Sequence, residues 1–379
     1  MSKTDNLSTT NSLKTRPLKM LLDELTLRKL DQWRASKAPN LTRAEAAKIL
    51  LTESLFDREL STTQKTRSHV SYPSTEQLAA LYSLERVSGF GPVKFRDMNE
   101  AGIDTRSVIE NPSTLPFTGL VGEKLRKGIS ALTKADFVID LKRAFEQLER
   151  AREFSASILT HGDPNYPKRV YASNNPIPVL YVRGDPKIWD GSGCVAVVGS
   201  RNTRQPYADG TRKFATTAAK KGIVVVSGFA LGADSIGHTT AFRVGGKTVC
   251  VMPCGLDKIF PPENRELWDQ LLSYPKAVFV SEFRFGQRAS SLLLRKRNKL
   301  IVAFAQGILV SQSAEDGGAM NAYKFGREQR KPVSTFKSDG TKETTGNALI
   351  AGDNRTGAFA FESTQDGMSY EAWLQKLSS

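Results

Sequence analysis

Two apolar runs that each end in small residues place the strongest constraint on the fold of this chain. They are Val195–Arg201 (VAVVGSR) and Val224–Asp234 (VVVSGFALGAD). A Val-rich run that stops at glycine is typical of a parallel strand, buried on both faces, that turns into a helix. Ligands of open α/β sheets bind at the carboxyl ends of such strands. Arg201 adds a planar cation suited to phosphate, so the two runs together predict a phosphate-bearing ligand over a doubly wound sheet.

The same alternation of apolar strands and helices extends over residues 155–362. It predicts an α/β domain with a doubly wound, mainly parallel sheet. The expected strands are Ser157–Thr160, Val179–Arg183, Cys194–Val198, Ile223–Ser227, Thr248–Met252, Val278–Glu282, Gly307–Val310 and Pro332–Phe336, and the expected helices are Tyr207–Lys221, Ala233–Val244, Asn264–Leu272, Leu292–Ala305 and Ala319–Gln329.

Smaller segments flank this domain. Residues 1–15 are polar and are expected to form a disordered tail, and residues 61–74 a polar linker. Between them, residues 16–60 contain a helix-start pattern, with Thr42 as N-cap and Glu45 three residues on. Residues 75–154 have the pattern of a small all-helical domain, and residues 363–379 that of a C-terminal helix or tail. The expected helices of the all-helical domain are Thr75–Val87, Glu123–Leu132 and Lys134–Phe154.

The charge balance favours a polyanionic partner. The chain has 54 basic and 39 acidic residues, a formal net charge of +15. An excess of this size indicates nucleic acid more often than a generic solubility charge. No window approaches the ~18 apolar residues of a membrane span, and the N-terminus lacks the apolar core of a signal peptide. We therefore expect a cytoplasmic protein with no membrane partner.

Redox, metal and catalytic signals are weak. Cys194, Cys250 and Cys254 lie in or beside apolar strand-like runs, which predicts buried reduced thiols. There is no C-x-x-C pair and only three histidines, so no metal site is expected. His238 is interpreted as a packed structural histidine. Neither a G-x-G-x-x-G loop nor a P-loop occurs, and we predict no cofactor and no catalytic residue.

Two strand-end turns are candidate ligand sites. Gly199, Ser200 and Arg201 follow one expected strand, and Ser227 and Gly228 end a neighbouring one. Free N–H groups at such turns bind phosphate, although a single turn of this kind is more often structural. Two of them on one edge favour a ligand. Gly317 and Gly318 form a third, weaker turn of the same kind.

A basic run, Arg295–Lys299, starts an expected helix, with Arg284 and Arg288 just before it. Such a run is usually a solvated surface. Cations are unfavourable at a helix N-terminus, so their position here indicates an anion. Arg297 and Asn298 are the preferred contacts.

At this point the chain resembles a known family. The similarity lies in a series of motifs that occur in the order of the DprA/Smf family (DNA-processing protein A). They are Ile158–Pro167, Pro178–Asp185, Val195–Arg201, Ser227–Asp234 with His238, Gly255–Asp257, Pro261–Asn264, Ser281-Glu282, Arg297–Lys299 and Gly346–Ile350.

The resemblance implies an extended Rossmann fold that binds single-stranded DNA, forms dimers, and helps to load the recombinase RecA during transformation. It implies no catalytic reaction. Its implied contacts, combined with the turns above, give the predicted nucleic-acid site: Gly199, Ser200, Arg201, Ser227, Gly228, Arg284, Arg288, Arg297, Asn298, Lys299, Gly317 and Gly318.

The chain departs from the family pattern in three places. Leu231 stands where the family has an arginine, and Asp316–Ala319 replaces a Gly-Ser-Gly-Ser turn. The C-terminal winged-helix domain of many members is expected to be missing.

The segments before the α/β domain resemble other DNA-binding modules. Residues 75–150 are similar to a SAM-like or helix-hairpin-helix domain, which is DNA-binding in some proteins and merely structural in others. Residues 17–60 resemble a ribbon-helix-helix fold, with a short strand at Pro17–Leu22. Arg16 and Lys19 are then possible contacts with duplex DNA. The alternative is a helical hairpin used only for dimerisation.

Two rival functions stay open. One is a nucleotide-sensing or LOG-type nucleotide-hydrolysing Rossmann protein. Hydrolysis is disfavoured because Glu315–Gly318 lacks the Pro, Thr and downstream Glu of the LOG turn. The other is a duplex-DNA-binding regulator in which the N-terminal unit selects the sequence.

Overall fold

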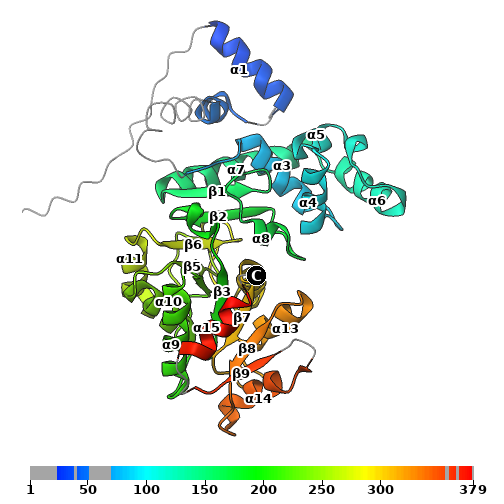
Figure 1. The fold of residues 1–379 in the computed structure, drawn as a ribbon. Coiled ribbons are helices and arrows are strands. Elements are labelled where there is room, and N and C mark those ends of the chain that lie inside the picture. The colour runs from blue at the N-terminus through cyan, green and yellow to red at the C-terminus, as the bar shows by residue number, and fades with distance from the viewer. Residues whose placement is uncertain (1–23, 38–40, 51–69, 355–357, 364–366, 378–379) are drawn as a thin grey trace, which may run out of the picture. The chain divides into compact units, whose positions relative to one another are not determined.

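The computed structural model describes residues 24–37, 41–50, 70–354, 358–363 and 367–377. The chain forms two compact units, Met1–Phe56 and Asp57–Ser379 (Figure 1).

The first unit contains helix α1 (Glu24–Lys37) and a second helix over residues 43–50. The predicted N-cap is confirmed: Thr42 Oγ1 accepts from Glu45 N–H at 3.2 Å, and Glu45 Oε2 accepts from Thr42 N–H at 2.9 Å. Asp31 of α1 pairs with Arg43 at the start of the second helix. The expected strand, with Arg16 and Lys19, lies outside the described residues, so the ribbon-helix-helix interpretation stays a prediction.

The second unit is built on one mixed sheet, as predicted. Its described strands run in the order β1-β2-β6-β5-β4-β3-β7-β8-β9. The first two strands are antiparallel to their neighbours, and the other pairs are parallel. The strands are β1 (Ala156–Thr160), β2 (Val179–Arg183), β3 (Cys194–Val198), β4 (Val224–Ser227), β5 (Thr248–Val251), β6 (Ala277–Ser281), β7 (Gly307–Val310), β8 (Val333–Phe336) and β9 (Phe359–Phe361).

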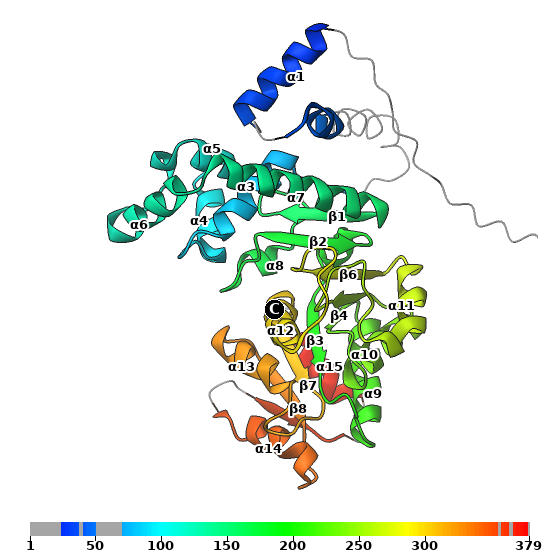
Figure 2. The ribbon, with the colours of Figure 1, turned by 180° about the vertical axis from the view of Figure 1, so that it is seen from behind.

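Helices cover both faces of this sheet (Figures 1 and 2). Side chains alternate along each strand. On β3, Val195 and Val197 therefore pack in one core, while Ala196 and Val198 pack in the other. The first core includes α9 (Tyr207–Lys220), α10 (Ala233–Arg243) and α15 (Gly367–Gln375), and the second includes α12 (Ser291–Phe304), α13 (Met320–Glu328) and α14 (Thr345–Ala351).

The helical segment before the sheet packs against its antiparallel edge. Helices α3 and α7 contact each other, and α7 contacts β1. The buried carboxylate of Asp140 on α7 accepts from Ser83 at 2.8 Å and pairs with Arg86 at 2.8 Å, which fixes α7 against α3. The remaining described helices of the second unit are α3 (Thr75–Glu85), α4 (Pro92–Glu100), α5 (Thr105–Glu110), α6 (Gly119–Ser130), α7 (Lys134–Glu153), α8 (Lys168–Tyr171) and α11 (Arg265–Leu272).

Several local expectations need correction. Helix α6 spans Gly119–Ser130 and therefore begins four residues before the expected start at Glu123. A Cβ at Gly122 would lie 2.0 Å from the carbonyl oxygen of Phe117, and the tight entry to α6 thus requires glycine. Helices α4, α5, α8 and α14 and strand β9 were not predicted. No helix in the described ranges is long and apolar enough to cross a membrane.

Candidate functional site

A cavity of about 460 Å³ opens where the strand order of the sheet reverses. Strands β4 to β6 extend from one side of β3, whereas β7 to β9 extend from the other, so the reversal lies between β3 and β7. The cavity is lined by residues 198–201 at the end of β3, by residues 313, 314 and 317–319 after β7, and by part of α12. This is the position at which open α/β sheets bind their ligands.

The turns after β3 and β4 are in direct backbone contact. Ala233 N–H, at the start of α10, donates to the carbonyl of Ser200 at 3.1 Å. A Cβ at Gly232 would lie 2.2 Å from the Ser200 oxygen and 2.6 Å from that of Arg201. Gly232 also has a φ of +73°, which favours glycine. The two predicted turns therefore form one rigid wall of the cavity.

Arg297 is a buried cation at the base of the cavity. It is 4% exposed, and its Nη1 donates to the carbonyls of Val251, at 2.7 Å, and Gly228. Burial lowers the pKa of Arg297 to about 10, although the negative charge of nearby Asp234 acts to raise it. The guanidinium is therefore protonated at neutral pH. It ties the ends of β4 and β5 together while it adds positive charge beneath the cavity.

Asp234 balances part of this charge. Its Oδ2 accepts from the N–H groups of Gly228 at 3.1 Å and Ala230 at 3.3 Å. Burial raises its pKa, and the charge of Arg297 opposes this rise. The carboxylate thus closes the turn after β4.

Two arginines line the cavity and are exposed. Within the described residues, no hydrogen bond or ion pair holds the side chain of Arg201 or of Arg295. The lining after β7 offers the N–H groups of Gly318 and Ala319, which have no acceptor in the described part of the chain. Guanidinium groups and unpaired backbone N–H groups are the donors that bind phosphate oxygens. This arrangement suits an anion.

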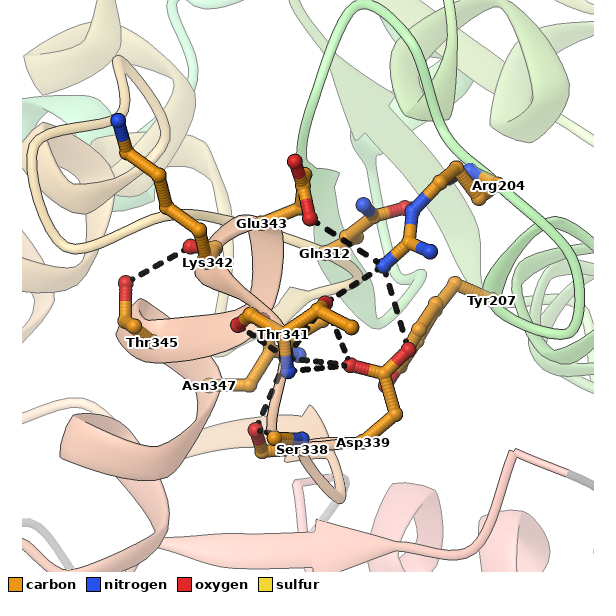
Figure 3. Close-up of polar contacts among 12 residues, drawn as sticks. Arg204, Tyr207, Gln312, Ser338, Asp339, Thr341, Lys342, Glu343, Thr345 and Asn347 are labelled. Atoms are coloured by element: carbon orange, nitrogen blue, oxygen red, sulfur yellow. Dashed lines mark hydrogen bonds and ion pairs between the residues drawn. The ribbon is translucent and has the colours of Figure 1, made fainter.

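Arg204 holds the loop after β3 in place (Figure 3). Its Nη2 pairs with Asp339 at 3.2 Å and donates to Thr341 Oγ1 at 2.7 Å, and its backbone N–H donates to Gln312 Oε1 at 2.8 Å. The backbone oxygen of Gln312 accepts from Ser200 N–H at 2.7 Å. Contacts from the loops after β7 and β8, which are distant in the sequence, therefore hold the turn Gly199–Arg201 in place.

Sequence reasoning missed this network, because its members are separated by more than a hundred residues. The hydroxyls of Thr341 and Thr344 hold the pKa of Asp339 well below its usual range. Asp339 therefore stays charged opposite Arg204. The short turn 338–341 has an Asx-type pattern, with Asp339 Oδ1 accepting from Thr341 N–H at 3.1 Å, but nothing local in it indicates the arginine partner.

The structure gathers most, not all, of the predicted site residues. Those that line the cavity are Gly199, Ser200, Arg201, Arg297, Asn298, Gly317 and Gly318. Asn298 Nδ2 donates to the Gly318 carbonyl at 3.3 Å.

The other five predicted residues are absent from this lining. Gly228 lies after β4, where its N–H donates to Asp234 and its carbonyl accepts from Arg297. Ser227 is fully buried and donates to the carbonyl of Val197. Lys299 lies over the ring of Phe325, with its ammonium 5.4 Å from the ring centroid, and Arg288 is exposed outside the cavity lining. Arg284 lines a separate cavity.

The basic run does not stand at a helix N-terminus. Helix α12 starts at Ser291, so Arg295–Lys299 occupies its second and third turns. The argument from an unfavourable helix dipole therefore does not apply. Because the residues of the run lie on different faces of α12, their surroundings differ. Arg295 lines the cavity together with Arg297 and Asn298.

His238 is a packed histidine, as interpreted from the sequence. It is 0% exposed, and its Nδ1 lies 2.6 Å from Thr248 Oγ1. Since Thr248 donates to the Val225 carbonyl at 2.8 Å, the proton lies on Nδ1. Burial lowers the pKa of His238 to about 3.

The three cysteines are free and buried, as predicted. Burial raises the pKa of the Cys194 thiol to about 11 and that of Cys254 to about 12. Both are therefore protonated at neutral pH.

Comparison with known proteins connects this architecture to one family. The family model described as DNA recombination-mediator protein A matches residues 157–369. The chain is 32% identical over 192 residues to Protein Smf of Synechocystis sp., covering 50% of this chain and 48% of that protein. It is 26% identical over 181 residues to DNA processing protein DprA of Bacillus subtilis, covering 47% of this chain and 60% of that protein.

A solved structure has the same fold. The X-ray structure of DNA processing protein A (DprA) from Streptococcus pneumoniae aligns with a TM-score of 0.57 and 19% identity, over 75% of this chain and 95% of that chain. The matched segments span less than two thirds of the two curated relatives.

Proposed function

Because this chain belongs to the DNA recombination-mediator protein A family, the DprA/Smf proteins, we propose that it binds single-stranded DNA in the cavity between the ends of β3 and β7. One observation carries this proposal. The exposed guanidinium groups of Arg201 and Arg295 and the unpaired N–H groups of Gly318 and Ala319 line one cavity at the strand-order reversal. The cavity lies within the segment that matches the family.

Each group has a defined role in this proposal. Arg201 and Arg295 pair with phosphate oxygens, and the Gly318 N–H donates to the same backbone. Arg297 cannot turn outward without breaking its bonds to two carbonyls, so it acts through its charge alone. Because all of these groups bind phosphate and not the bases, the affinity for single-stranded DNA depends little on base sequence and falls steeply as the salt concentration rises. No chemical step is involved, and we propose a non-enzymatic role.

We further propose that the protein acts in the cytoplasm as a homodimer that passes single-stranded DNA to a recombinase of the RecA type. The description of the family as recombination mediators supports this role. Analytical ultracentrifugation tests the dimer. Measuring RecA filament growth on DNA coated with a single-strand-binding protein, with and without this protein, tests the transfer.

The Arg201→Ala substitution tests the cavity. Loss of one charge-assisted contact is expected to weaken binding of a single-stranded oligonucleotide by about 1–3 kcal/mol. The slope of log K against log salt should become shallower by about 0.7, the value for one phosphate contact on a single strand. Fluorescence anisotropy at several salt concentrations measures both.

Arg265→Ala is the matched control. Arg265 lies on α11, and its side chain is 68% exposed. It forms an exposed ion pair with Asp269, one helical turn away, at 3.5 Å. It lies outside the cavity lining, so its removal should leave affinity within about twofold. Equal effects of the two substitutions would argue for diffuse attraction by the basic surface, against a site at this cavity.

Nucleotide sensing is the second candidate function. The cavity volume of about 460 Å³ is within the ~300–1,000 Å³ of small-molecule sites, so it also accommodates a mononucleotide. A competition experiment decides between the two. Mononucleotides at millimolar concentration should fail to displace an oligonucleotide if several phosphates are bound together, and should displace it if the cavity is a nucleotide sensor.

A further inference from the structure

A second cavity, of about 420 Å³, lies at the carboxyl end of β6. Strand β2 runs antiparallel to β6, with Tyr181 opposite Ser281, so the start of β2 and the end of β6 meet there. Helix α3 contributes the opposite wall through Tyr82 and Glu85. Because β3 to β7 are parallel to β6, both cavities open on the same edge of the sheet.

The charges in the second cavity are already paired. Arg284 Nη2 lies 2.8 Å from Glu85 Oε2, and Lys296 Nζ lies 2.8 Å from Glu282 Oε2. A phosphate would have to break one of these pairs and approach a carboxylate. The cavity therefore disfavours an anion, in contrast to the first one. A neutral group with both N–H donors and acceptors is compatible with these polar walls.

The cavity also presents a stacking surface. The Arg284 guanidinium lies over the Tyr82 ring, 3.8 Å from its centroid. Tyr82 is 1% exposed, and its hydroxyl lies 2.6 Å from that of Tyr181, so the ring is fixed. The Arg284 side chain is still 34% exposed. Nucleobases stack on guanidinium planes and aromatic rings, and here a buried ring holds the guanidinium in place for such a contact.

Helix α12 connects the two cavities. Lys296 lines the second cavity, whereas Arg295 and Asn298 line the first. The reversal point between β7 and β3 lies four strand spacings from the β6–β2 junction, which is roughly 19 Å at ~4.8 Å a strand. A stacked strand with the ~3.4 Å rise of duplex DNA covers this distance with about six nucleotides, and an unstacked strand covers it with fewer.

We propose that the second cavity receives an unstacked base of the same DNA strand whose backbone occupies the first cavity. The base stacks on the Arg284 guanidinium. Its polar edge faces the wall that contains the carboxylates of Glu85 and Glu282 and the amides of Asn175 and Gln287. This inference rests on the proposed function. It changes the role of Arg284 from a phosphate contact to a base contact.

The Arg284→Lys substitution tests this assignment. Lysine keeps the positive charge beside Glu85 but removes the planar surface. Affinity of the full chain is measured for an oligothymidylate and for an abasic oligomer of the same length. We expect Arg284→Lys to weaken oligothymidylate binding by about 5- to 150-fold, the range for losing one stacked base, and to leave abasic binding within about twofold.

Arg106→Lys on α5, where Arg106 pairs with Glu110 at 3.1 Å, is the matched control and should change neither affinity. The thermal midpoint of each variant verifies folding. Equal weakening on both oligomers would assign Arg284 to phosphate, and no weakening on either would assign it to a structural ion pair. Both results overturn the proposal. If the unsubstituted protein binds neither oligomer, or if Arg201→Ala has no effect, the proposed function fails and this inference fails with it.

Discussion

The contact between the turns after β3 and β4 makes Gly232 the most sensitive backbone position of the site. In Gly232→Ala, the new Cβ would lie 2.2 Å from the Ser200 oxygen and 2.6 Å from the Arg201 oxygen. Both are backbone atoms, so no side-chain rotation relieves the clash. The turn that carries Arg201 must move away from α10, and the hydrogen bond from Ala233 N–H to Ser200 must lengthen.

The expected loss of stability has two parts. Gly232 has a φ of +73° and a ψ of −125°, which lies outside the left-handed helical region, so placing alanine there costs about 1–3 kcal/mol. Forcing a methyl group into a packed site costs about 1–3 kcal/mol more. Gly245→Ala tests a positive φ without a clash, because Gly245 has a φ of +72° and nothing within 4 Å of its Cβ position. We therefore expect about 1–2 kcal/mol for Gly245→Ala and about 2–6 kcal/mol for Gly232→Ala.

Urea denaturation measures both values, and oligonucleotide anisotropy measures binding. Gly232→Ala should also weaken DNA binding, since the Arg201 turn is displaced, whereas Gly245→Ala should not. Equal destabilisation by the two substitutions, with unchanged DNA affinity, would refute the close backbone contact and the role assigned to it.

Two further predictions concern pH and the N-terminal unit. Since the folded pKa of His238 is about 3 and the unfolded value is about 6.5, the unfolded state binds more protons between these values. The free energy of unfolding therefore decreases as pH falls below about 6.5, and this residue accounts for about 2 kcal/mol of the decrease at pH 5. Urea denaturation of His238→Gln should show a correspondingly smaller decrease between pH 7 and pH 5. A decrease equal to that of the unsubstituted protein would contradict the buried neutral histidine. Deleting residues 1–56, the first compact unit, should leave the affinity for single-stranded DNA within about threefold, as measured by anisotropy, because the cavity lies in the second unit. Loss of that binding would show that the DNA site needs the N-terminal unit, which would favour the duplex-binding regulator.

Local patterns predicted the sheet well because its strands are buried on both faces. The run Cys194–Val198 is apolar without interruption and ends at a glycine, and the structure has β3 over the same residues. Strand β9 is different. Phe359 is about half exposed at the sheet edge, and a run of three residues has too little periodicity to stand out.

The candidate site was predictable only in part, for a similar reason. Turn residues such as Gly199 and Gly318 are local signals, and they lie where the strand-end argument put them. The partner of a cation is not a local signal. Arg284 pairs with Glu85, on a helix of a different segment, and a sequence pattern alone could not separate it from the cations of the first cavity.

The glycine contacts also divide the site into positions that tolerate change and positions that do not. A Cβ at Gly199 would lie 2.7 Å from the Cβ of Ala233, and one at Gly228 would lie 2.1 Å from Arg297. These positions, with Gly232, fix the backbone of the proposed ligand site. Arg201 and Arg295 line the cavity beside this backbone, yet no side-chain hydrogen bond or ion pair in the described residues holds them. Ligand preference can therefore evolve, or be engineered, by exchanging these two side chains while the backbone scaffold stays the same.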